Sequence, residues 1–175
     1  MPQQNRLNLP SAPVKRQREN RDLFNEARSP EIADFFTVGY TGRKLADIFA
    51  MLEANGVRTL VDIRKNPISM YRPELSKTNL KRLTEERGLE YCHVPEWGVP
   101  RDIRAKAIAA GTREVIWNWY DEYVTAEEIG DNLHNFLNRF DHPVALMCVE
   151  IDPQECHRHC LSEHLQKLGL VGFDL

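Results

Sequence analysis

Short apolar runs that alternate with helical patterns limit most strongly how this chain folds. FFTVG at 35–39 is apolar and β-branched and ends in glycine, as a buried strand does. VRTLVDIR at 57–64 is a second such run, and it ends in charge. The segment 43–56 between them has apolar residues at helical spacing and ends in Asn55-Gly56, a helix stop. A helix that joins two buried strands makes them parallel through a right-handed crossover.

The same alternation continues to the end of the chain. Further strands are predicted at 89–94, at 144–150 and, as an edge strand, at 170–175. Helices are predicted at 76–87, 101–140 and 156–169, with breaks in the long region near Gly111 and near Thr125, where Thr125 and Glu128 form a capping-box pattern. We therefore predict an α/β fold with three layers, in which a mostly parallel central sheet of four to five strands carries helices on both faces.

The first 30 residues differ from the rest in composition. They are rich in Asn, Gln, Arg and Pro and carry six basic against three acidic side chains. This composition predicts that residues 1–30 are a disordered basic tail and that residues 31–175 form a single α/β domain. The whole chain has a net charge of −3, so the domain itself is acidic. An acidic domain is a poor general partner for a phosphate backbone, and nucleic-acid binding would fall to the tail.

Four cysteines and the absence of an apolar leader or membrane-length run indicate the compartment. The N-terminus lacks the apolar core of a secretory signal, and no run approaches the ~18 apolar residues of a membrane span. We expect a cytoplasmic protein without membrane contact, in which the thiols are free or metal-bound rather than paired.

Polar or small residues stand at the end of each predicted strand. They are Tyr40 after the first strand, Asp62 and Arg64 at the second, His93 at the third, and Cys148 and Glu150 at the fourth. The carboxyl ends of parallel strands gather at one edge, where α/β proteins bind ligands. Because side chains alternate between the two faces, Asp62 and Arg64 share one face and Cys148 and Glu150 share another. We expect both pairs to line a common crevice.

Two arginines suggest what this crevice binds. Arg64 offers a planar fork of donors, and Arg158 lies near a predicted helix N-terminus, so together they would hold a phosphate or carboxylate. Asp62 or Glu150 would act as general acid or base, and His93 or His157 could share that role. The alternative for Asp62 and Arg64 is a structural ion pair.

The cysteines and histidines leave two further possibilities open. Cys148 is either a nucleophile or a buried apolar thiol, and its distance from Arg158 does not match the Cys-x5-Arg loop of phosphatases. Cys156, His157, His159 and Cys160 lie on one predicted helix turn and could bind zinc with Cys92, His93 or Cys148. Their spacing matches no zinc finger, knuckle or ribbon. We therefore predict no metal ligands, and the cofactor stays unknown.

Four motifs in this order resemble the domain of unknown function 488 family. They are FTVGYTGR, VDIRKNPIS, YCHVPEWG and VALMCVEIDPQECHRH, and the resemblance covers about residues 35–170. It implies a bacterial or archaeal α/β domain of three layers but no reaction, since the family's function is not established. The motif positions are Gly39, Tyr40, Asp62, Arg64, Pro67, Ser69, His93, Cys148, Glu150, Cys156, His157 and Arg158. The resemblance thus adds Tyr40 and Ser69 to the residues that we predict to bind the substrate. Trp97 stands where the family often has glycine, which would narrow the crevice.

Two functional hypotheses follow. The first is an enzyme that acts on a small phosphate- or carboxylate-bearing substrate, including a nucleotide or nucleic-acid end. Its catalytic residues would be Asp62, Glu150, His157 and Cys148, and its substrate-binding residues Tyr40, Arg64, Ser69, His93 and Arg158. The second is a non-catalytic module that senses an anion or a metal and reaches a partner through its basic tail.

Overall fold

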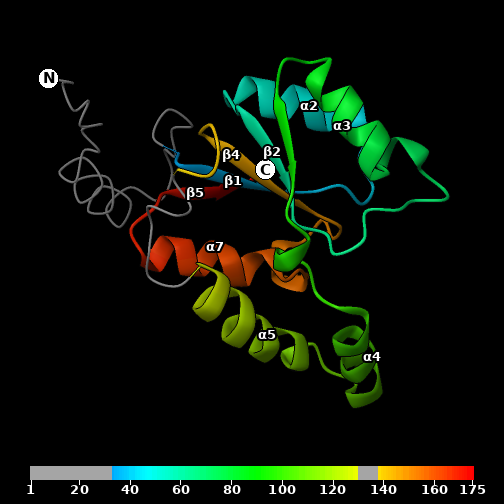
Figure 1. Cartoon of the computed structure of the whole chain (residues 1–175), viewed down its shortest axis with the longest axis vertical. Coiled ribbons are helices and arrows are strands. Elements are labelled where there is room, and N and C mark those ends of the chain that lie inside the picture. Colours follow the sequence, from blue (N-terminus) through cyan, green and yellow to red (C-terminus); the bar gives the residue numbers. More distant parts are fainter. Residues whose placement is uncertain (1–32, 130–137) are drawn as a thin grey trace, which may run out of the picture.

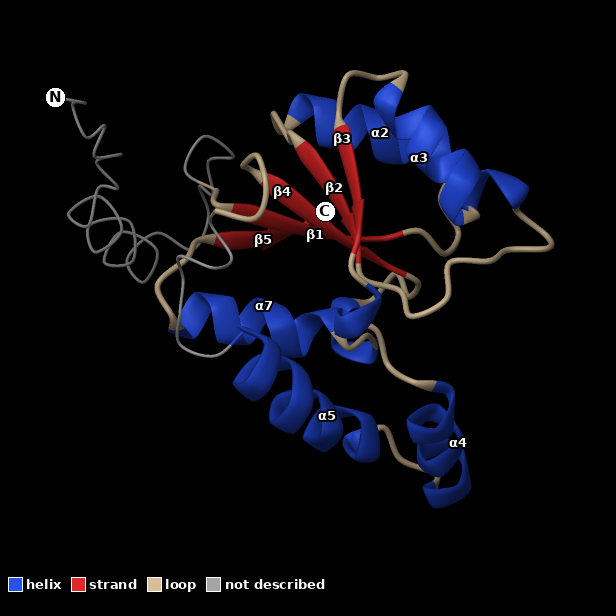
Figure 2. Ribbon diagram, viewed as in Figure 1, coloured by secondary structure: helices blue, strands red, loops and turns tan. Residues whose placement is uncertain are grey.

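A parallel β-sheet forms the centre of the protein, as the computed structural model shows (Figures 1 and 2). The structure describes residues 33–129 and 138–175, so the predicted tail lies outside the described residues. The strands are β1 (Phe35–Gly39), β2 (Thr59–Asp62), β3 (Glu90–His93), β4 (Val144–Cys148) and β5 (Gly172–Asp174). Their order is β3-β2-β4-β1-β5, and every neighbouring pair is parallel. The predicted sheet and its edge strand are confirmed.

Two helical layers enclose this sheet (Figure 2). Helices α2 (Leu45–Ala54) and α3 (Lys77–Glu85) cover one face, and α7 (Arg158–Lys167) covers the other. Helix α5 (Glu114–Tyr120) continues into a π-helical segment, Asp121–Ile129, which packs on α7, and α4 (Arg101–Ala110) packs on α5. Short 3₁₀ turns lie at Pro73–Leu75, Pro95–Trp97 and Pro153–Glu155. The described part of the chain thus has the predicted three-layer α/β architecture.

Strands that are buried on both faces divide the core into two clusters. The alternate residues Phe36 and Val38 of β1 pack with α2, whereas Phe35 packs toward α7. Burial on both faces explains why the strands are continuous apolar runs rather than alternating ones.

The path of the chain makes β4 the point where the winding reverses. The connections from β1 to β2 and from β2 to β3 run through α2 and α3 on one face. The later connections run through α4, α5 and α7 on the other face, and they insert β4 between β1 and β2 (Figure 1). The segment that follows β4 therefore leaves the sheet on the side opposite to those that follow its two neighbours. Such a switch point is where α/β sheets form their binding crevice.

The long helical region differs from its prediction in one respect. The predicted break at Gly111 is confirmed, since this residue ends α4 with a left-handed φ of 66°. The predicted break near Thr125 is wrong. The chain stays helical there, and the Thr125 hydroxyl donates to the carbonyl oxygen of Asp121 at 2.7 Å instead of capping a new helix. The remainder of the predicted region, 130–137, lies outside the described residues.

Candidate functional site

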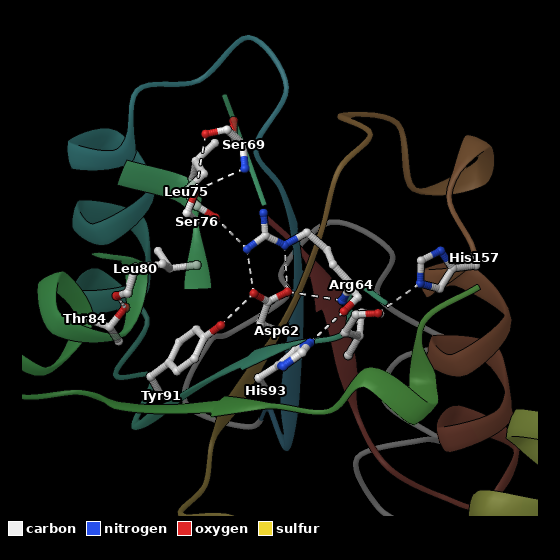
Figure 3. A network of polar contacts seen from close by, with 11 residues as sticks. Asp62, Arg64, Ser69, Leu75, Ser76, Leu80, Thr84, Tyr91, His93 and His157 are labelled. Atoms are coloured by element: carbon white, nitrogen blue, oxygen red, sulfur yellow. Dashed lines mark hydrogen bonds and ion pairs between the residues drawn. The ribbon is translucent and has the colours of Figure 1, made fainter. Parts of the chain in front are cut away.

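Asp62 and Arg64 form a buried ion pair at the end of β2 (Figure 3). Oδ1 of Asp62 accepts from Nε of Arg64 at 2.7 Å, and Oδ2 accepts from Nη2 at 2.6 Å. The backbone N–H of Arg64 and the hydroxyl of Tyr91 donate to the same carboxylate at 3.1 and 2.8 Å. Asp62 is 0% exposed and Arg64 is 4% exposed. The carboxylate is therefore saturated by protein donors, which favours the structural alternative for this pair.

The loop after β2 is built around this arginine. Nη2 of Arg64 also donates to the carbonyl oxygen of Leu75 at 2.9 Å, and the guanidinium lies 5.3 Å from the ring centre of Tyr40. Nε2 of His93 lies 2.8 Å from the carbonyl oxygen of Arg64 (Figure 3). The hydroxyl of Ser69 accepts from the backbone N–H of Arg72. Four of the predicted site residues thus hold the path of this loop, and their predicted role in substrate binding stays untested.

The two predicted pairs do not share a crevice. In the parallel register, Asp62 lies opposite Met147 and not opposite Cys148. Neighbouring residues in register point to the same face, so Asp62 points toward α3 while Cys148 belongs to the core cluster under α7. The expectation that Asp62 and Arg64 line one crevice with Cys148 and Glu150 is therefore wrong. The register between β2 and β4 is offset by one residue from the one that would put both pairs on the same face.

Arg158 is also occupied by the protein. It is 0% exposed, and its Nε lies 3.1 Å from the hydroxyl oxygen of Thr37. Nη1 donates to the carbonyl oxygen of Glu150, and Nη2 donates to that of Ile151 at 2.9 Å. The predicted convergence of Arg64 and Arg158 on one anion is therefore wrong, because the two groups lie on different faces and bind protein oxygens.

Gly39 allows this arrangement. A side chain there would collide with the carbonyl group of Glu150 and crowd the guanidinium of Arg158. The glycine after β1 therefore lets the segment that follows β4 cross close over the sheet.

A pocket of about 400 Å³ opens beside the segment that follows β4, near Glu150. Glu150 and His157 line it from the β4 side, and Arg104 and Arg113 line it from the α4 and α5 side. The remaining lining is mostly apolar: Val99, Ala107, Ile108, Gly111, Thr112, Ile116, Trp117 and Glu155. Trp97, by contrast, is 2% exposed in the core and does not line this pocket, so the expected narrowing by Trp97 is wrong.

Three sulfur and nitrogen donors meet behind this pocket. Cys148 at the end of β4 and Cys156 and His157 before α7 are all buried, and one ligand atom from each lies within 4.8 Å of the others. Sγ of Cys148 lies 3.6 Å from Nδ1 and 3.7 Å from Nε2 of His157. Nε2 lies 3.4 Å from the carbonyl oxygen of Ile63, which joins this cluster to the end of β2 (Figure 3).

The environment distinguishes the acidic groups of this cluster. Burial raises the pKa of the Cys148 thiol well above its usual value, and the neighbouring Cys156 adds to the effect. Burial alone would also raise the pKa of Cys156, but hydrogen bonds with Cys148, His157 and the backbone of Arg158 lower it. Burial and the neighbouring Cys156 raise the pKa of Glu150. These directions disfavour Cys148 as a nucleophile and favour the thiolate form of Cys156.

Sequence reasoning missed the far wall of the pocket. Arg104 and Arg113 belong to no recognisable sequence motif. To find them from the sequence, one would have to predict how α4 and α5 pack opposite the end of β4. Trp117 is partly buried next to His159, with ring centres 4.6 Å apart, and lies at the edge of the core. The alternative of a metal site with Cys156, His157, His159 and Cys160 does not bring all four together. His159 and Cys160 contact each other at 3.5 Å, outside the group that Cys148 completes.

The sheet order, the two helical layers and the pocket at the switch point define a doubly wound α/β protein. The family model described as Domain of unknown function DUF488 matches residues 44–165, so the chain belongs to this family. The comparisons with curated proteins and with solved structures gave no match. Within the described residues, no helix has the length and apolar character needed to cross a membrane.

Proposed function

We propose that the protein is an enzyme that acts on a small phosphate- or carboxylate-bearing substrate, which binds in the pocket at the end of β4. The observation that carries the proposal is the position of Arg104 and Arg113 opposite Glu150 in this pocket. The proposed anion contacts are therefore Arg104 and, beside it, Arg113, in place of the predicted Arg64 and Arg158.

One charge of the pocket, that of Arg104, favours an anionic ligand. Among the residues that the structure describes, Arg104 has no carboxylate partner, so its charge is available to a ligand. Arg113 is partly neutralised by Glu155, with Nη2 and Oε2 3.7 Å apart. An arginine that is free of protein partners binds phosphate or carboxylate through a planar pair of donors.

The size and lining of the pocket suit a small molecule. About 400 Å³ lies within the range of roughly 300–1,000 Å³ that is typical of ligand pockets. Ile116 and Trp117 provide an apolar wall for the uncharged part of the substrate. A duplex or a long strand does not fit this volume, so we propose a free small molecule or a single terminal nucleotide.

Glu150 is the group that we propose for proton transfer. It is half-buried at the inner wall of the pocket, where a carboxyl group can reach a bound substrate and is partly shielded from water. The four free cysteines agree with a reducing, cytoplasmic location, which we propose with the function.

The test measures binding and turnover with the same probes. Inorganic phosphate, AMP and p-nitrophenyl phosphate are titrated calorimetrically, and release of phosphate is followed for the two esters. We expect Arg104→Ala to weaken binding at least tenfold, whereas Arg101→Ala, at the exposed start of the same helix, leaves it unchanged. Glu150→Gln should abolish turnover but retain binding, and Glu163→Gln on the surface of α7 is its control.

Two results would overturn the proposal. Binding that is equal in wild type and Arg104→Ala would remove the pocket as the anion site. Binding without turnover of either ester would replace the enzyme with the alternative, a non-catalytic anion-binding module.

A further inference from the structure

A second feature lies behind the pocket and does not depend on the proposed reaction. Cys148, Cys156 and His157 come from two separate segments, the end of β4 and the start of α7, and meet in the interior. Among the residues that the structure describes, they are the one group of three sulfur, nitrogen or carboxylate donors this close together. We propose that these three residues bind a thiophilic divalent cation and that Zn²⁺ is the ion they fit best.

The distances match a tetrahedral site. Zinc bonds of about 2.3 Å to sulfur and about 2.0–2.1 Å to nitrogen, at tetrahedral angles, place the two donor atoms about 3.6 Å apart. Sγ of Cys148 lies 3.6 Å from Nδ1 and 3.7 Å from Nε2 of His157. Both separations are close to the sulfur–nitrogen distance in a zinc site, and all three donors lie within reach of one ion.

The surroundings of His157 orient the ring for a metal. A metal-binding histidine usually donates its other ring N–H to a carboxylate or backbone carbonyl, which fixes the ring. Nε2 of His157 lies 3.4 Å from the carbonyl oxygen of Ile63, and when it donates there Nδ1 is the ring nitrogen left to bind the ion. The ring also packs against Tyr120, with ring centres 5.1 Å apart, so its position is set by the core.

Charge and softness select the kind of ion. Metal binding would release the proton of the Cys148 thiol, and the cation would compensate two thiolate charges that otherwise repel each other in the interior. Two thiolates and a neutral imidazole balance a double positive charge, and soft sulfur donors prefer zinc to magnesium or calcium. The N-terminus of α7 adds a backbone N–H from Arg158 to Cys156, which favours its thiolate further.

The fourth position explains why the site adjoins a pocket. His157 and Glu150 both line the pocket, and Cys156 is close enough to Glu150 to raise the pKa of its carboxyl group. Water, a ligand oxygen or this carboxylate would therefore complete the tetrahedron. Three protein ligands and one open position are the arrangement of catalytic zinc, whereas structural zinc is usually closed by four protein ligands.

The experiment measures metal on the full-length protein. Protein purified without chelators is analysed for metal by mass spectrometry, and zinc is then exchanged for Co²⁺. We expect one zinc per chain and, with cobalt, a sulfur-to-metal charge-transfer band together with intense visible bands of a four-coordinate ion. The band should lose about half its intensity in Cys148→Ser and in Cys156→Ser, since each variant keeps one thiolate.

Matched variants separate this site from general effects of cysteine loss. Cys160→Ser, one turn along α7, and Cys92→Ser, on β3, should retain the metal and the cobalt spectrum. Because the wild-type spectrum reports thiolate ligation directly, a variant that fails to fold does not remove the test. Folding of each variant is checked by circular dichroism.

Three results would overturn the inference. The first is folded wild-type protein that takes up neither zinc nor cobalt at micromolar concentration. The second is a Cys148–Cys156 disulfide in protein purified under reducing conditions, shown by thiol titration. The third is loss of the cobalt spectrum in Cys160→Ser. Metal binding without phosphoester turnover would leave this inference intact and remove the proposed function, so the two proposals fail separately.

Discussion

Replacing Arg64 by methionine tests whether the ion pair at the end of β2 is structural. Methionine keeps the length and apolar stem of the side chain but removes both donors to Asp62, which lie at 2.7 and 2.6 Å. Asp62 is 0% exposed, so the variant leaves an uncompensated carboxylate in the interior. The loss of one partner from a buried pair costs about 3–5 kcal/mol. For a domain of this size, about 1 kcal/mol lowers Tm by roughly 2–4 °C, so Tm should fall by roughly 6–20 °C.

The assay is urea unfolding followed by circular dichroism and tryptophan fluorescence, with a thermal melt beside it. Arg72→Met is the matched control, because Arg72 lies in the same loop, also approaches the Tyr40 ring, and pairs with Glu74 at a partly exposed position. It should change the free energy of unfolding by at most about 1 kcal/mol. The double variant Asp62→Asn/Arg64→Met should lose less than Arg64→Met, because it buries no unpaired charge.

One outcome would refute the structural interpretation of Arg64. If Arg64→Met unfolds within about 1 kcal/mol of wild type, the carboxylate is not desolvated as the structure indicates. If that stable variant also loses phosphate binding, Arg64 is an anion-binding residue after all. The expected result is the opposite: reduced stability, and phosphate binding that is unchanged under conditions where the variant is folded.

Two further substitutions test neighbouring features by thermal and urea unfolding. Gly39→Ala should lower the free energy of unfolding by about 3 kcal/mol, because the new methyl group meets the rigid backbone of Glu150. The control is Gly88→Ala, at a left-handed position in open space, which should cost ~1–2 kcal/mol. A cost for Gly39→Ala no larger than that of the control would contradict the close approach. Tyr91→Phe should cost about 1–2 kcal/mol, because Asp62 loses one donor and keeps three; an unchanged stability would mean that the Tyr91 hydroxyl is hydrated rather than bonded at 2.8 Å.

The strands could be predicted because their signal is local. FFTVG at 35–39 matches β1 residue for residue, and the core of VALMCVE became β4, Val144–Cys148. Thr125 shows the limit of local signals. Its capping-box spacing predicts a helix start, but its hydroxyl instead bonds one turn back to Asp121 within a continuous helix.

The candidate site could be predicted only in part. The β4 end with Glu150 and His157 lines a pocket, as the strand-end pattern leads one to expect, and its role as the functional site stays a prediction. Alternation correctly put Asp62 and Arg64 on one face of their own strand, but it does not give the register between strands. That register pairs Asp62 with Met147, and an offset of one residue separates the two predicted halves. Arg104 depends on how distant helices pack, which no local pattern encodes.

The position of β4 has a consequence for how the protein is made. β4 lies between β1 and β2 in the sheet, although it follows both in the chain. More than a hundred residues separate it from β1. Until Val144–Cys148 has left the ribosome, β1 and β2 cannot complete the sheet, and each presents an apolar edge with unpaired backbone groups. Such edges pair readily with other chains. Nascent chains and fragments that end before Val144 are therefore the species most prone to aggregate, and the sheet closes late in synthesis through contacts that are far apart in sequence.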